Sequence, residues 1–511
     1  MTHERICLLD FGAQYAQLIA RRVREHHCYC EILPFDAPPD RLRGARGIIL
    51  TGGPASVYAP DAPRCAPEVF ELGVPVLGIC YGMQLMCHRL GGRVVAADRR
   101  EFGHARLRIE KDGDLFHELS GTTPVWMSHG DRVEDPGPGF EVLATTTNTP
   151  FAAVRHPERR LYGIQFHPEV THTERGREIL GNFLTRACRM SGDWQMGAFV
   201  EEEVARIRER VGDARVVLGL AGGVDSMVTA KLCERAIGAR LHPIFVDNGL
   251  LRRGEAQEVR EAFGRHFEGE LHFIDAADLF LDRLRGVGDP EQKRRIIGRT
   301  FIEVFSDRAC ELEDVRFLAQ GTLYPDVIES VAAHGGPTAT IKTHHNVGGL
   351  PAELGFELVE PLRELFKDEV RTIGRALGLP ERVVGRQPFP GPGLAVRVLG
   401  EVTRERLRTL READAIILDE IRGAGLYTEL WQSFGVLLPI HAVGVMGDER
   451  TYENVLALRA VTSVDAMTAD WADLPRDLLS RISNRVINEV RGINRVVYDV
   501  SSKPPATIEW E

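Results

Sequence analysis

The sequence predicts an α/β protein with two larger α/β units and a smaller α/β unit at the C-terminus. At 511 residues the chain is too long for one hydrophobic core, and its length favours two to four domains. Short apolar segments alternate with helical segments along most of the chain. The segment Pro-Phe-Pro-Gly-Pro-Gly at 388–393 suits neither a helix nor a central strand, and it marks a hinge before the last unit.

The first unit is expected to span residues 1–192. Apolar strand-length segments lie at 6–9, 47–50 and 74–79, and a helix is expected from Met83. In folds of this kind the active groups lie on loops at the ends of strands. The alternation closes near residue 188, and residues 191–212 are predicted to form a polar connection followed by an amphipathic helix at 201–210.

The second unit is expected at 193–386 and the third at 387–511. The second begins with a strand at 216–220, a glycine-rich turn, a helix that runs to Arg235 and a strand at 241–246. The third is predicted to contain helices at 403–422 and 476–490 and strands near 436–445 and 496–500.

Composition excludes several classes of protein. The chain is 43% hydrophobic and 27% charged, and it has no apolar run long enough to predict a membrane span. The N-terminus runs straight into the first strand, so no signal peptide is expected. A net charge of −11 argues against a nucleic-acid-binding surface. Nine cysteines without a C-x-x-C pair favour a reducing, cytoplasmic setting.

A cysteine in a tight turn is the first candidate for chemistry. Gly78-Ile79-Cys80-Tyr81-Gly82 follows a predicted strand, and the Tyr81 N–H would point to where an oxyanion forms. A second strand, at 161–166, ends in His167-Pro168-Glu169, where the histidine can deprotonate the thiol and the carboxylate can orient the imidazole. Thr51-Gly52-Gly53-Pro54 adds a further backbone donor at Gly53.

Two features weaken any single element of that site. A free cysteine is commonly a buried apolar residue, and we assign that role to Cys7, Cys65, Cys87, Cys188, Cys233 and Cys310. The letters His-Pro-Glu also recur at 156–158, where a surface turn is expected.

A glycine-rich turn is the second candidate. No Walker motif is present, but Ala221-Gly222-Gly223-Val224-Asp225-Ser226 leads from a strand into a helix, so its N–H groups can form an anion site. Asp225 could hold Mg²⁺ and Ser226 could donate to a phosphate. The alternative is a plain helix start that these two side chains cap.

Three downstream motifs follow or flank predicted strands and favour the anion site. They are Phe245-Val246-Asp247-Asn248-Gly249, Gln320-Gly321-Thr322-Leu323-Tyr324-Pro325-Asp326 and Lys342-Thr343-His344-His345-Asn346. Adjacent histidines point apart and Asn346 is a poor third ligand, so no zinc site is expected there.

Residues 1–190 resemble the triad-type glutamine amidotransferase domain, through 51–54, 78–82 and 167–169 in that order. The resemblance implies Cys80 as nucleophile, His167 as general base and Glu169 as its orienter. It also implies an oxyanion hole at Gly53 and Tyr81, and ammonia from glutamine as the product.

The second unit resembles the pyrophosphatase-type (PP-loop) ATP-binding domain, which adenylates substrates and releases pyrophosphate. The resemblance implies that ATP enters with Mg²⁺ and that no tightly bound organic cofactor is needed. The implied ATP contacts are Ala221, Gly222, Gly223, Val224, Asp225, Ser226, Met227 and Lys367.

The end of the chain resembles the glutamine-hydrolysing GMP synthetase family. The matching segments are 341–351, 386–394, 465–471, 494–499 and the tail Lys503-Pro504-Pro505-Ala506-Thr507-Ile508-Glu509-Trp510-Glu511. The resemblance covers essentially the whole chain and implies the amination of XMP to GMP with ATP and glutamine by a homodimer joined through its C-terminal domain. The implied XMP contacts are Arg294, Lys503, Ile508 and Glu509, with Arg294 on a mobile lid; a solvated helix face is the alternative for Arg294.

Other functions remain open at this stage. One is an amidotransferase–synthetase that acts on a carboxylate. A synthetase with an N-terminal cysteine nucleophile is disfavoured because residue 2 is threonine, and a tRNA-thiolating enzyme because paired cysteines and a basic face are lacking. The last is a catalytically weakened, nucleotide-binding homologue, because Ala221 stands where the PP-loop family usually has serine.

Overall fold

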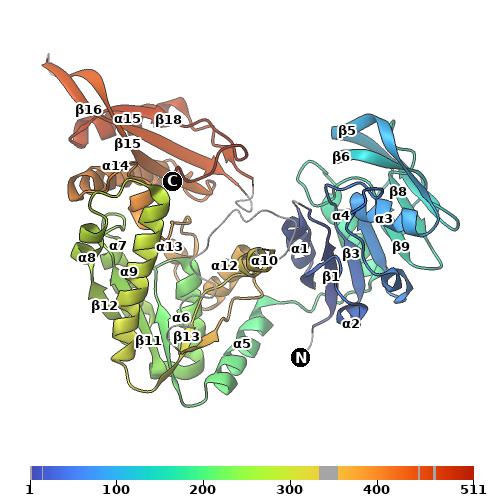
Figure 1. The fold of residues 1–511 in the computed structure, drawn as a ribbon, viewed down its shortest axis with the longest axis horizontal. Helices are drawn as coiled ribbons and strands as arrows, with labels where there is room; N and C mark the ends of the chain where they lie inside the picture. Colours follow the sequence, from blue (N-terminus) through green and yellow to red (C-terminus); the bar gives the residue numbers. More distant parts are fainter. Residues whose placement is uncertain (1–2, 14, 333–354, 447–448, 464–467) are drawn as a thin grey trace. The chain divides into compact units, whose positions relative to one another are not determined.

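The computed structural model describes residues 3–13, 15–332, 355–446, 449–463 and 468–511. The chain divides into two compact units. The first contains Met1–Phe199 and the described part of Pro325–Thr343, and the second contains Val200–Tyr324 and the described part of His344–Glu511. The predicted α/β class is confirmed, because each unit combines helices with sheets (Figure 1).

The first unit is built on one mixed sheet of nine strands in the order β2-β1-β3-β4-β9-β8-β7-β5-β6. Neighbours from β2 to β9 run parallel and those from β9 to β6 run antiparallel. The strands are β1 (Arg5–Asp10), β2 (Tyr29–Pro34), β3 (Gly47–Leu50), β4 (Val76–Ile79), β5 (Arg93–Ile109), β6 (Thr122–Asp135), β7 (Glu141–Thr145), β8 (Ala153–His156) and β9 (Leu161–Ile164).

The parallel half of this sheet agrees with the predicted alternation, and its strands β1, β3, β4 and β9 are apolar and buried. Its helices are α1 (Ala16–Arg24), α2 (Pro39–Leu42), α3 (Tyr81–Arg89) and α4 (Gly176–Asn182). The helix expected from Met83 begins two residues earlier, at Tyr81. The antiparallel half was not predicted, since β5 and β6 are long and only partly apolar.

The second unit begins with a five-stranded parallel sheet in the order β12-β11-β10-β13-β14. Its strands are β10 (Arg215–Gly219), β11 (Leu241–Asp247), β12 (His272–Asp275), β13 (Val315–Ala319) and β14 (Glu357–Val359). The accompanying helices are α5 (Met196–Val211), α6 (Val224–Ile237), α7 (Glu255–His266), α8 (Ala277–Arg283), α9 (Pro290–Cys310), α12 (Lys367–Ala376) and α13 (Glu381–Val384). Helix α10 (Tyr324–Ala332) begins at Tyr324, and its other residues belong to the first unit. The predicted strand, glycine turn, helix and strand are all present.

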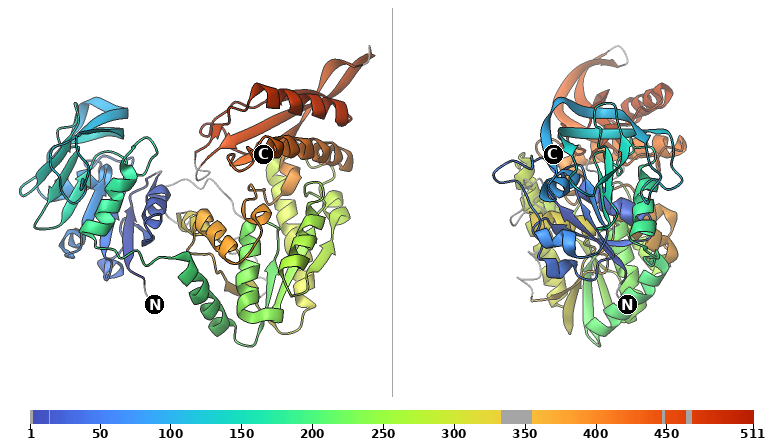
Figure 2. Two further views of the ribbon diagram at one scale, coloured as in Figure 1. Left: turned by 180° about the vertical axis from the view of Figure 1, so that it is seen from behind. Right: turned by 90° about the vertical axis from the view of Figure 1, so that its right-hand side faces the viewer.

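A four-stranded sheet completes the second unit. The strands are β15 (Gln432–Met446), β16 (Glu449–Thr462), β17 (Asp470–Trp471) and β18 (Ile493–Tyr498), and the helices are α14 (Arg404–Gly423) and α15 (Arg476–Glu489). Strand β16 pairs with β15 and β17 antiparallel and with β18 parallel. Helices α14 and α15 pack together and against this sheet (Figure 2).

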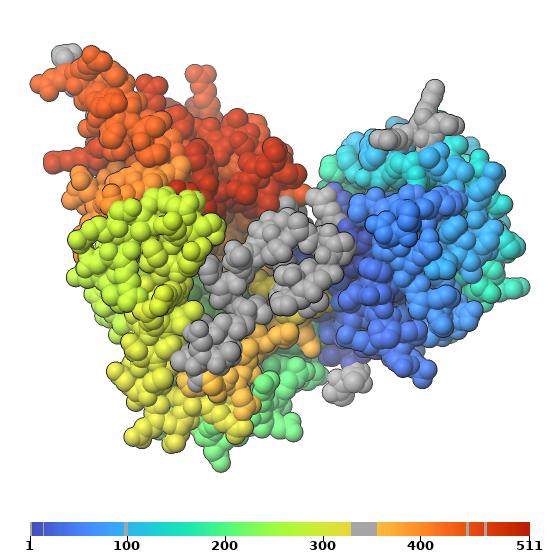
Figure 3. All heavy atoms as spheres, viewed as in Figure 1, coloured from blue at the N-terminus to red at the C-terminus, as the bar shows by residue number. Residues whose placement is uncertain are grey.

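The hydrophobic core of the second unit is continuous across the predicted boundary at 386/387. One buried cluster includes Val217 of β10, Ile244 of β11, Leu410 of α14 and Leu456 of β16. The β15–β16 hairpin projects from the surface of the second unit (Figure 3), and it exposes Ile440, Val443, Val445 and Tyr452.

Eight of the nine cysteines are buried, which agrees with the structural role expected for most of them. The assignment is wrong for Cys310, which is exposed. The residue is the last of α9, where the helix meets solvent.

Among the described residues, no helix is both long and apolar enough to cross a membrane.

Candidate active sites

Cys80 lies in the strained turn that joins β4 to α3. Its φ and ψ are 50° and −105°, a left-handed conformation that is uncommon outside glycine. A Cβ added at Gly78 would lie 2.5 Å from the amide nitrogen of Met83, and one at Gly82 would meet the carbonyl oxygen of Leu50. The turn therefore requires glycine on both sides of the cysteine, and it holds the thiol at the N-terminus of a helix.

His167 and Glu169 form a buried pair beside this turn. The Nδ1 atom of His167 is 2.7 Å from Oε1 of Glu169, and both side chains are buried. A Cβ at Gly52 would lie 3.4 Å from Cε1 of His167 and 3.8 Å from Cβ of Cys80, so Gly52 contacts both. The three residues expected to form a triad are thus brought together.

The electrostatics of this pair favour a charged imidazole. Burial lowers the pKa of His167, but the Glu169 charge and hydrogen bonds with Cys80 and Glu169 outweigh it, so the pKa lies well above 6.5. By contrast, burial raises the pKa of Cys7 and Cys65 to about 11, and these thiols stay protonated. His156 ends β8 and is followed by an exposed turn, as expected for the repeated His-Pro-Glu.

The two predicted oxyanion donors are next to residues at the thiol: Tyr81 follows Cys80 and begins α3, and Gly53 follows Gly52. Tyr81 is the first residue of α3, so its N–H belongs to the first turn, whose donors the helix itself does not satisfy. Its ring is buried, and its hydroxyl donates to the carbonyl of Pro63 at 2.7 Å. A Cβ at Gly53 would lie 2.7 Å from the carbonyl oxygen of Phe11, so only glycine fits there.

Two glutamines beside the thiol were not predicted. Gln165 follows β9, and its Nε2 lies 3.6 Å from Sγ of Cys80. Gln84 on α3 donates through Nε2 to the carbonyl of Asp131 at 2.8 Å and to Oε1 of Gln165 at 3.3 Å. The spacing in the sequence could have indicated both glutamines, because Gln84 is four residues after Cys80 on a helix and Gln165 is two residues before His167.

The glycine-rich turn leads from β10 into α6 as expected. Gly222 has a φ of 71°, and a Cβ there would collide with Val259. The Ser226 hydroxyl donates to the carbonyl of Gly223 at 3.0 Å and accepts from the N–H of Ala221 at 3.3 Å. The hydroxyl therefore closes the turn, but no side chain caps α6, so the first N–H groups of the helix remain an anion site.

Lys367 lies at this turn although it is 142 positions away along the chain from Asp225. It is the first residue of α12, and its Nζ is 2.6 Å from Oδ2 of Asp225. Oδ1 of Asp225 is buried without a hydrogen-bond partner among the described residues. Val224 and Met227, by contrast, are buried in packing contacts, and Ala221 is exposed.

The residues present fit a magnesium ion that is shared with phosphates. Mg²⁺ is usually bound by one or two carboxylates together with water and substrate phosphates, and Asp225 supplies one carboxylate with a free buried oxygen. Within the described residues, no group of three or more His, Cys, Asp or Glu side chains could form an all-protein metal site.

Two of the three supporting motifs lie at the carboxyl ends of parallel strands. Asp247 ends β11, and its Oδ1 accepts from the N–H of Gly249 at 3.0 Å. The 320–326 motif follows β13, and Thr322 donates to Glu360 at 2.7 Å. The third motif, 342–346, and residues 341–351 and 465–467 of the segments that resemble the family lie outside the described residues.

The C-terminal tail is tied to the second unit by ion pairs. Glu509 accepts from Arg397 Nη2 at 2.8 Å and Nε at 3.1 Å, and from Gln432 at 2.7 Å. Ile508 is buried in a small core with Phe434. Lys503 pairs with Ala469 through backbone hydrogen bonds of 2.7 and 3.0 Å. The Glu509 carboxylate thus already has partners within the protein.

Arg294 also contacts this tail. It lies inside the regular helix α9, where a lid had been expected, and it donates to the backbone oxygen of Glu511. Its neighbour Lys293 is fully buried and bonds Glu511 Oε2 at 2.5 Å and the carbonyls of Ala395 and Val398. The charge run at 293–295 is therefore only partly a solvated face.

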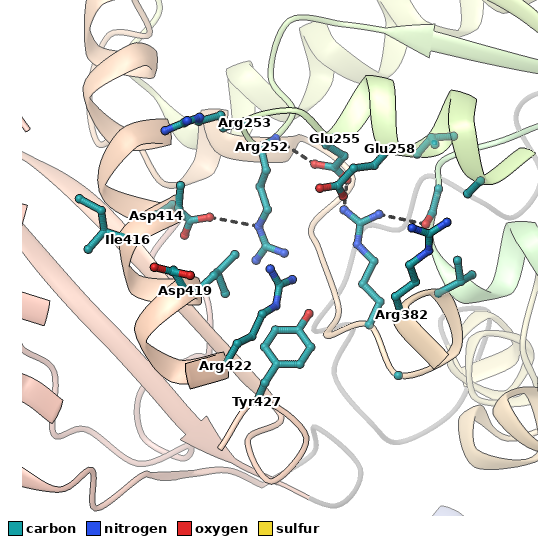
Figure 4. A pocket seen from close by; sticks show the side chains of 18 of the residues that line it. Arg252, Arg253, Glu255, Glu258, Arg382, Asp414, Ile416, Asp419, Arg422 and Tyr427 are labelled. Atoms are coloured by element: carbon teal, nitrogen blue, oxygen red, sulfur yellow. Dashed lines mark hydrogen bonds and ion pairs between the residues drawn. The ribbon is translucent and has the colours of Figure 1, made fainter. Parts of the chain in front are cut away.

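A cavity of about 1240 Å³ lies in the second unit and was not predicted (Figure 4). Gly222 borders it from the glycine-rich turn and Met227 from α6, and α7, α13, α14, α15 and the segments next to these helices supply the rest. Arg252 lies 3.2 Å from Asp414 in a buried ion pair at its wall. Arginines and carboxylates line the cavity in similar numbers, so it carries no strong excess of either charge.

Comparison with known proteins shows the family of the chain. The models "Glutamine amidotransferase class-I", "NAD synthase" and "GMP synthase C terminal domain" match residues 7–187, 195–259 and 419–510. A protein named GMP synthase [glutamine-hydrolyzing] from Thermomicrobium roseum is 61% identical over 99% of this chain and 97% of its own length. A protein of the same name from Aquifex aeolicus is 55% identical over the full length of both chains. The solved structure of a glutamine amidotransferase from Thermotoga maritima is 18% identical over 37% of this chain and 99% of its own, with a TM-score of 0.32. The chain belongs to the family of glutamine-hydrolysing GMP synthases.

Proposed function

We propose that this protein aminates XMP to GMP with ATP, using ammonia that it releases from glutamine. The observation that supports the proposal is the presence of two candidate sites in one chain of this family. One is a strained cysteine beside a His–Glu pair at 2.7 Å, and the other is a glycine-rich turn whose Asp225 meets Lys367 at 2.6 Å.

In the first site, Cys80 attacks the side-chain amide carbon of glutamine. His167 takes the thiol proton and passes it to the leaving nitrogen, which departs as ammonia and leaves a thioester on Cys80. The N–H groups of Gly53 and Tyr81 stabilise the negative oxygen of the tetrahedral state. Water then cleaves the thioester and releases glutamate. Glu169 holds the imidazole in the orientation that both steps need.

In the second site, the O2 oxygen of XMP attacks the α-phosphorus of ATP, and pyrophosphate leaves. The N–H groups at the start of α6 and the Lys367 ammonium neutralise the phosphate charge, and the proposed ATP contacts are Ala221, Gly222, Gly223, Val224, Asp225, Ser226 and Met227 in the turn and the first turn of α6. Mg²⁺ held by Asp225 would supply further charge neutralisation. Ammonia then attacks C2 of the adenylated purine, and AMP leaves.

The acceptor is assigned to the C-terminal region, with Arg294, Lys503, Ile508 and Glu509 as its contacts. An ammonium or guanidinium suits the nucleotide phosphate, and a carboxylate suits the purine N–H groups. Since Glu509 is bonded to Arg397 and Gln432, XMP must either share this carboxylate or displace one of its partners.

We further propose the domain division 1–192, 193–386 and 387–511 and a homodimer formed through the last domain. The exposed apolar side chains of the β15–β16 hairpin support the dimer, with Val445 at 76% and Tyr452 at 69% exposure. A cytoplasmic setting agrees with nine free cysteines, and the net charge of −11 supports small-molecule substrates without nucleic acid.

The proposal is tested by the choice of acceptor. AMP release is measured with ATP, glutamine and either XMP or a carboxylate acceptor such as aspartate. We expect AMP and GMP in equal amounts with XMP and none with aspartate. AMP release with aspartate and not with XMP would move the protein to the carboxylate-amidating alternative. The weakened-homologue alternative from Ala221 is not supported, since relatives at 55–61% identity are named GMP synthase.

A further inference from the structure

Gln165 is fully buried and its amide faces the sulfur of Cys80. The Nε2 atom lies 3.6 Å from Sγ, and the side chain has no exposed surface. The backbone N–H of Gln165 donates to the carbonyl of Ala152 at 2.9 Å, which fixes the residue in line with β9. Its position next to the reacting atom is therefore set by the sheet.

The orientation of this amide follows from its neighbour. Gln84 Nε2 donates to the carbonyl of Asp131, and a carbonyl can only accept, so the NH₂ group of Gln84 must be on that side. The same NH₂ group lies 3.3 Å from Oε1 of Gln165. If Gln165 were flipped, two NH₂ groups would face each other. The NH₂ group of Gln165 therefore faces the sulfur.

Besides His167, the sulfur has two neighbours that act in opposite directions. The carbonyl of Ser128 lies 3.7 Å from Sγ and can accept only from the neutral S–H, so it stabilises the thiol. The Gln165 N–H can donate to sulfur and becomes a stronger partner when the sulfur is charged.

We propose that Gln165 is a catalytic residue of glutamine hydrolysis, whose Nε2–H donates to the Cys80 thiolate while Gln84 fixes its orientation. The inference rests on the proposed role of Cys80 as nucleophile. The bond acts twice in each turnover. It first stabilises the attacking thiolate. When water attacks the thioester and the C–S bond breaks, the sulfur leaves with the electron pair and accepts the same bond again.

The test uses the full-length protein and two substitutions. Gln165→Met removes the donor and keeps the volume, and Gln165→Glu keeps the shape and replaces the donor with an acceptor. Asn182→Leu is the matched control, because it removes another amide of the same unit that donates only to the carbonyls of Leu115 and His117. For each variant, the rate of Cys80 alkylation by iodoacetamide is followed from pH 5 to 10 by peptide mass spectrometry, together with glutaminase kcat and KM.

A hydrogen bond to a charged partner corresponds to roughly 1–2 pH units in a titration and about ten- to a hundredfold in rate. We expect Gln165→Met to raise the midpoint of alkylation by that amount and to lower kcat with little change in KM. Gln165→Glu should raise the alkylation midpoint and lower kcat further than Gln165→Met does. Asn182→Leu should leave both readouts as in the wild type. A wild-type alkylation profile in Gln165→Met, or an equal shift in Asn182→Leu, would overturn the proposal. Should Gln165→Glu fail to fold, Gln165→Met decides.

Cys80→Ala, measured alongside, separates this inference from the proposed function. Loss of glutaminase in Cys80→Ala with wild-type behaviour in both Gln165 variants contradicts the inference alone. Retained glutaminase in Cys80→Ala contradicts the assignment of the nucleophile, and the inference with it.

Discussion

The ion pair between Arg397 and Glu509 gives a prediction whose size can be worked from the structure. The Arg397 side chain is completely buried, its guanidinium lies 3.9 Å from the centre of the Phe434 ring, and its Nη1 has no hydrogen-bond partner among the described residues. The Glu509 carboxylate binds it through both oxygens. Glu509→Ala leaves this cation buried without its carboxylate.

Removal of one partner from a buried ion pair costs about 3–5 kcal/mol. Glu509 is 19% exposed, so water can reach part of the gap, and we expect the lower end, about 3 kcal/mol. Since about 1.4 kcal/mol is a factor of ten, backbone amides near the tail should exchange hydrogen roughly a hundredfold faster. Glu509→Gln keeps a hydrogen bond to Arg397 and should cost only about 1 kcal/mol.

The assay is hydrogen exchange by mass spectrometry on peptides from 500–511 and from β15, without XMP. Asp278→Ala is the matched control, because Asp278 pairs with Arg404 in the same unit and both side chains are largely exposed. An exposed pair contributes about 0–1 kcal/mol, so exchange should change less than about fivefold. Exchange in Glu509→Ala no faster than in Asp278→Ala would refute the reasoning.

Three further predictions concern the two proposed sites. Because the pKa of His167 is raised, its contribution to the unfolding free energy is complete below about pH 6.5 and is lost as pH rises through the folded value. Glu169→Gln should therefore remove this stability increment at low pH. Chemical denaturation of the wild type and the variant at a series of pH values measures the increment, and parallel stability–pH curves would contradict the raised pKa of His167. Lys367→Ala removes the charge beside Asp225 and should raise the ATP requirement about tenfold or more in the ammonium-dependent reaction, with glutaminase unchanged; an unchanged ATP dependence would exclude Lys367 from the nucleotide site. Ala221→Ser adds one donor to the loop and should lower the apparent KM for ATP by about threefold to tenfold in steady-state assays; no change would mean that the hydroxyl does not reach the phosphates.

Local patterns were sufficient to predict the cysteine site. The turn around Cys80 is specified by glycines at 78 and 82 that nothing larger can replace, and both lie next to the residue they position. His167 and Glu169 are two residues apart after a strand, and this spacing places both on one side of the chain. The meeting of these residues with Cys80 followed from the parallel pairing of β4 with β9.

Long-range pairs could not be predicted in this way. The sequence around Lys293 has the pattern of a solvated charge run, yet Lys293 is fully buried and bonds the last residue of the chain, 218 positions away. The carboxylate of Glu509 was expected to face a ligand, and its bond to Arg397 spans 112 positions. A charge pattern in the sequence shows which residues carry charge. The partner of each charged side chain depends on tertiary packing, as for Lys293, where α9 packs against the tail.

The antiparallel half of the first sheet was missed for a related reason. Strand β6 alternates more and less buried side chains, and both β5 and β6 contain several charged residues, so they lack the continuous apolar run of a parallel strand. Strand β6 also supplies Ser128, whose carbonyl contacts the Cys80 sulfur.

The central claim is that one site makes ammonia and a second site consumes it to make GMP. The most direct measurement is GMP formation by Cys80→Ala with XMP and ATP, supplied either with glutamine or with ammonium. The account predicts that the glutamine-dependent reaction is lost while the ammonium-dependent reaction proceeds at the wild-type rate, because external ammonia bypasses the thiol. Full glutamine-dependent activity in the variant, or loss of both reactions in a folded protein, would contradict it.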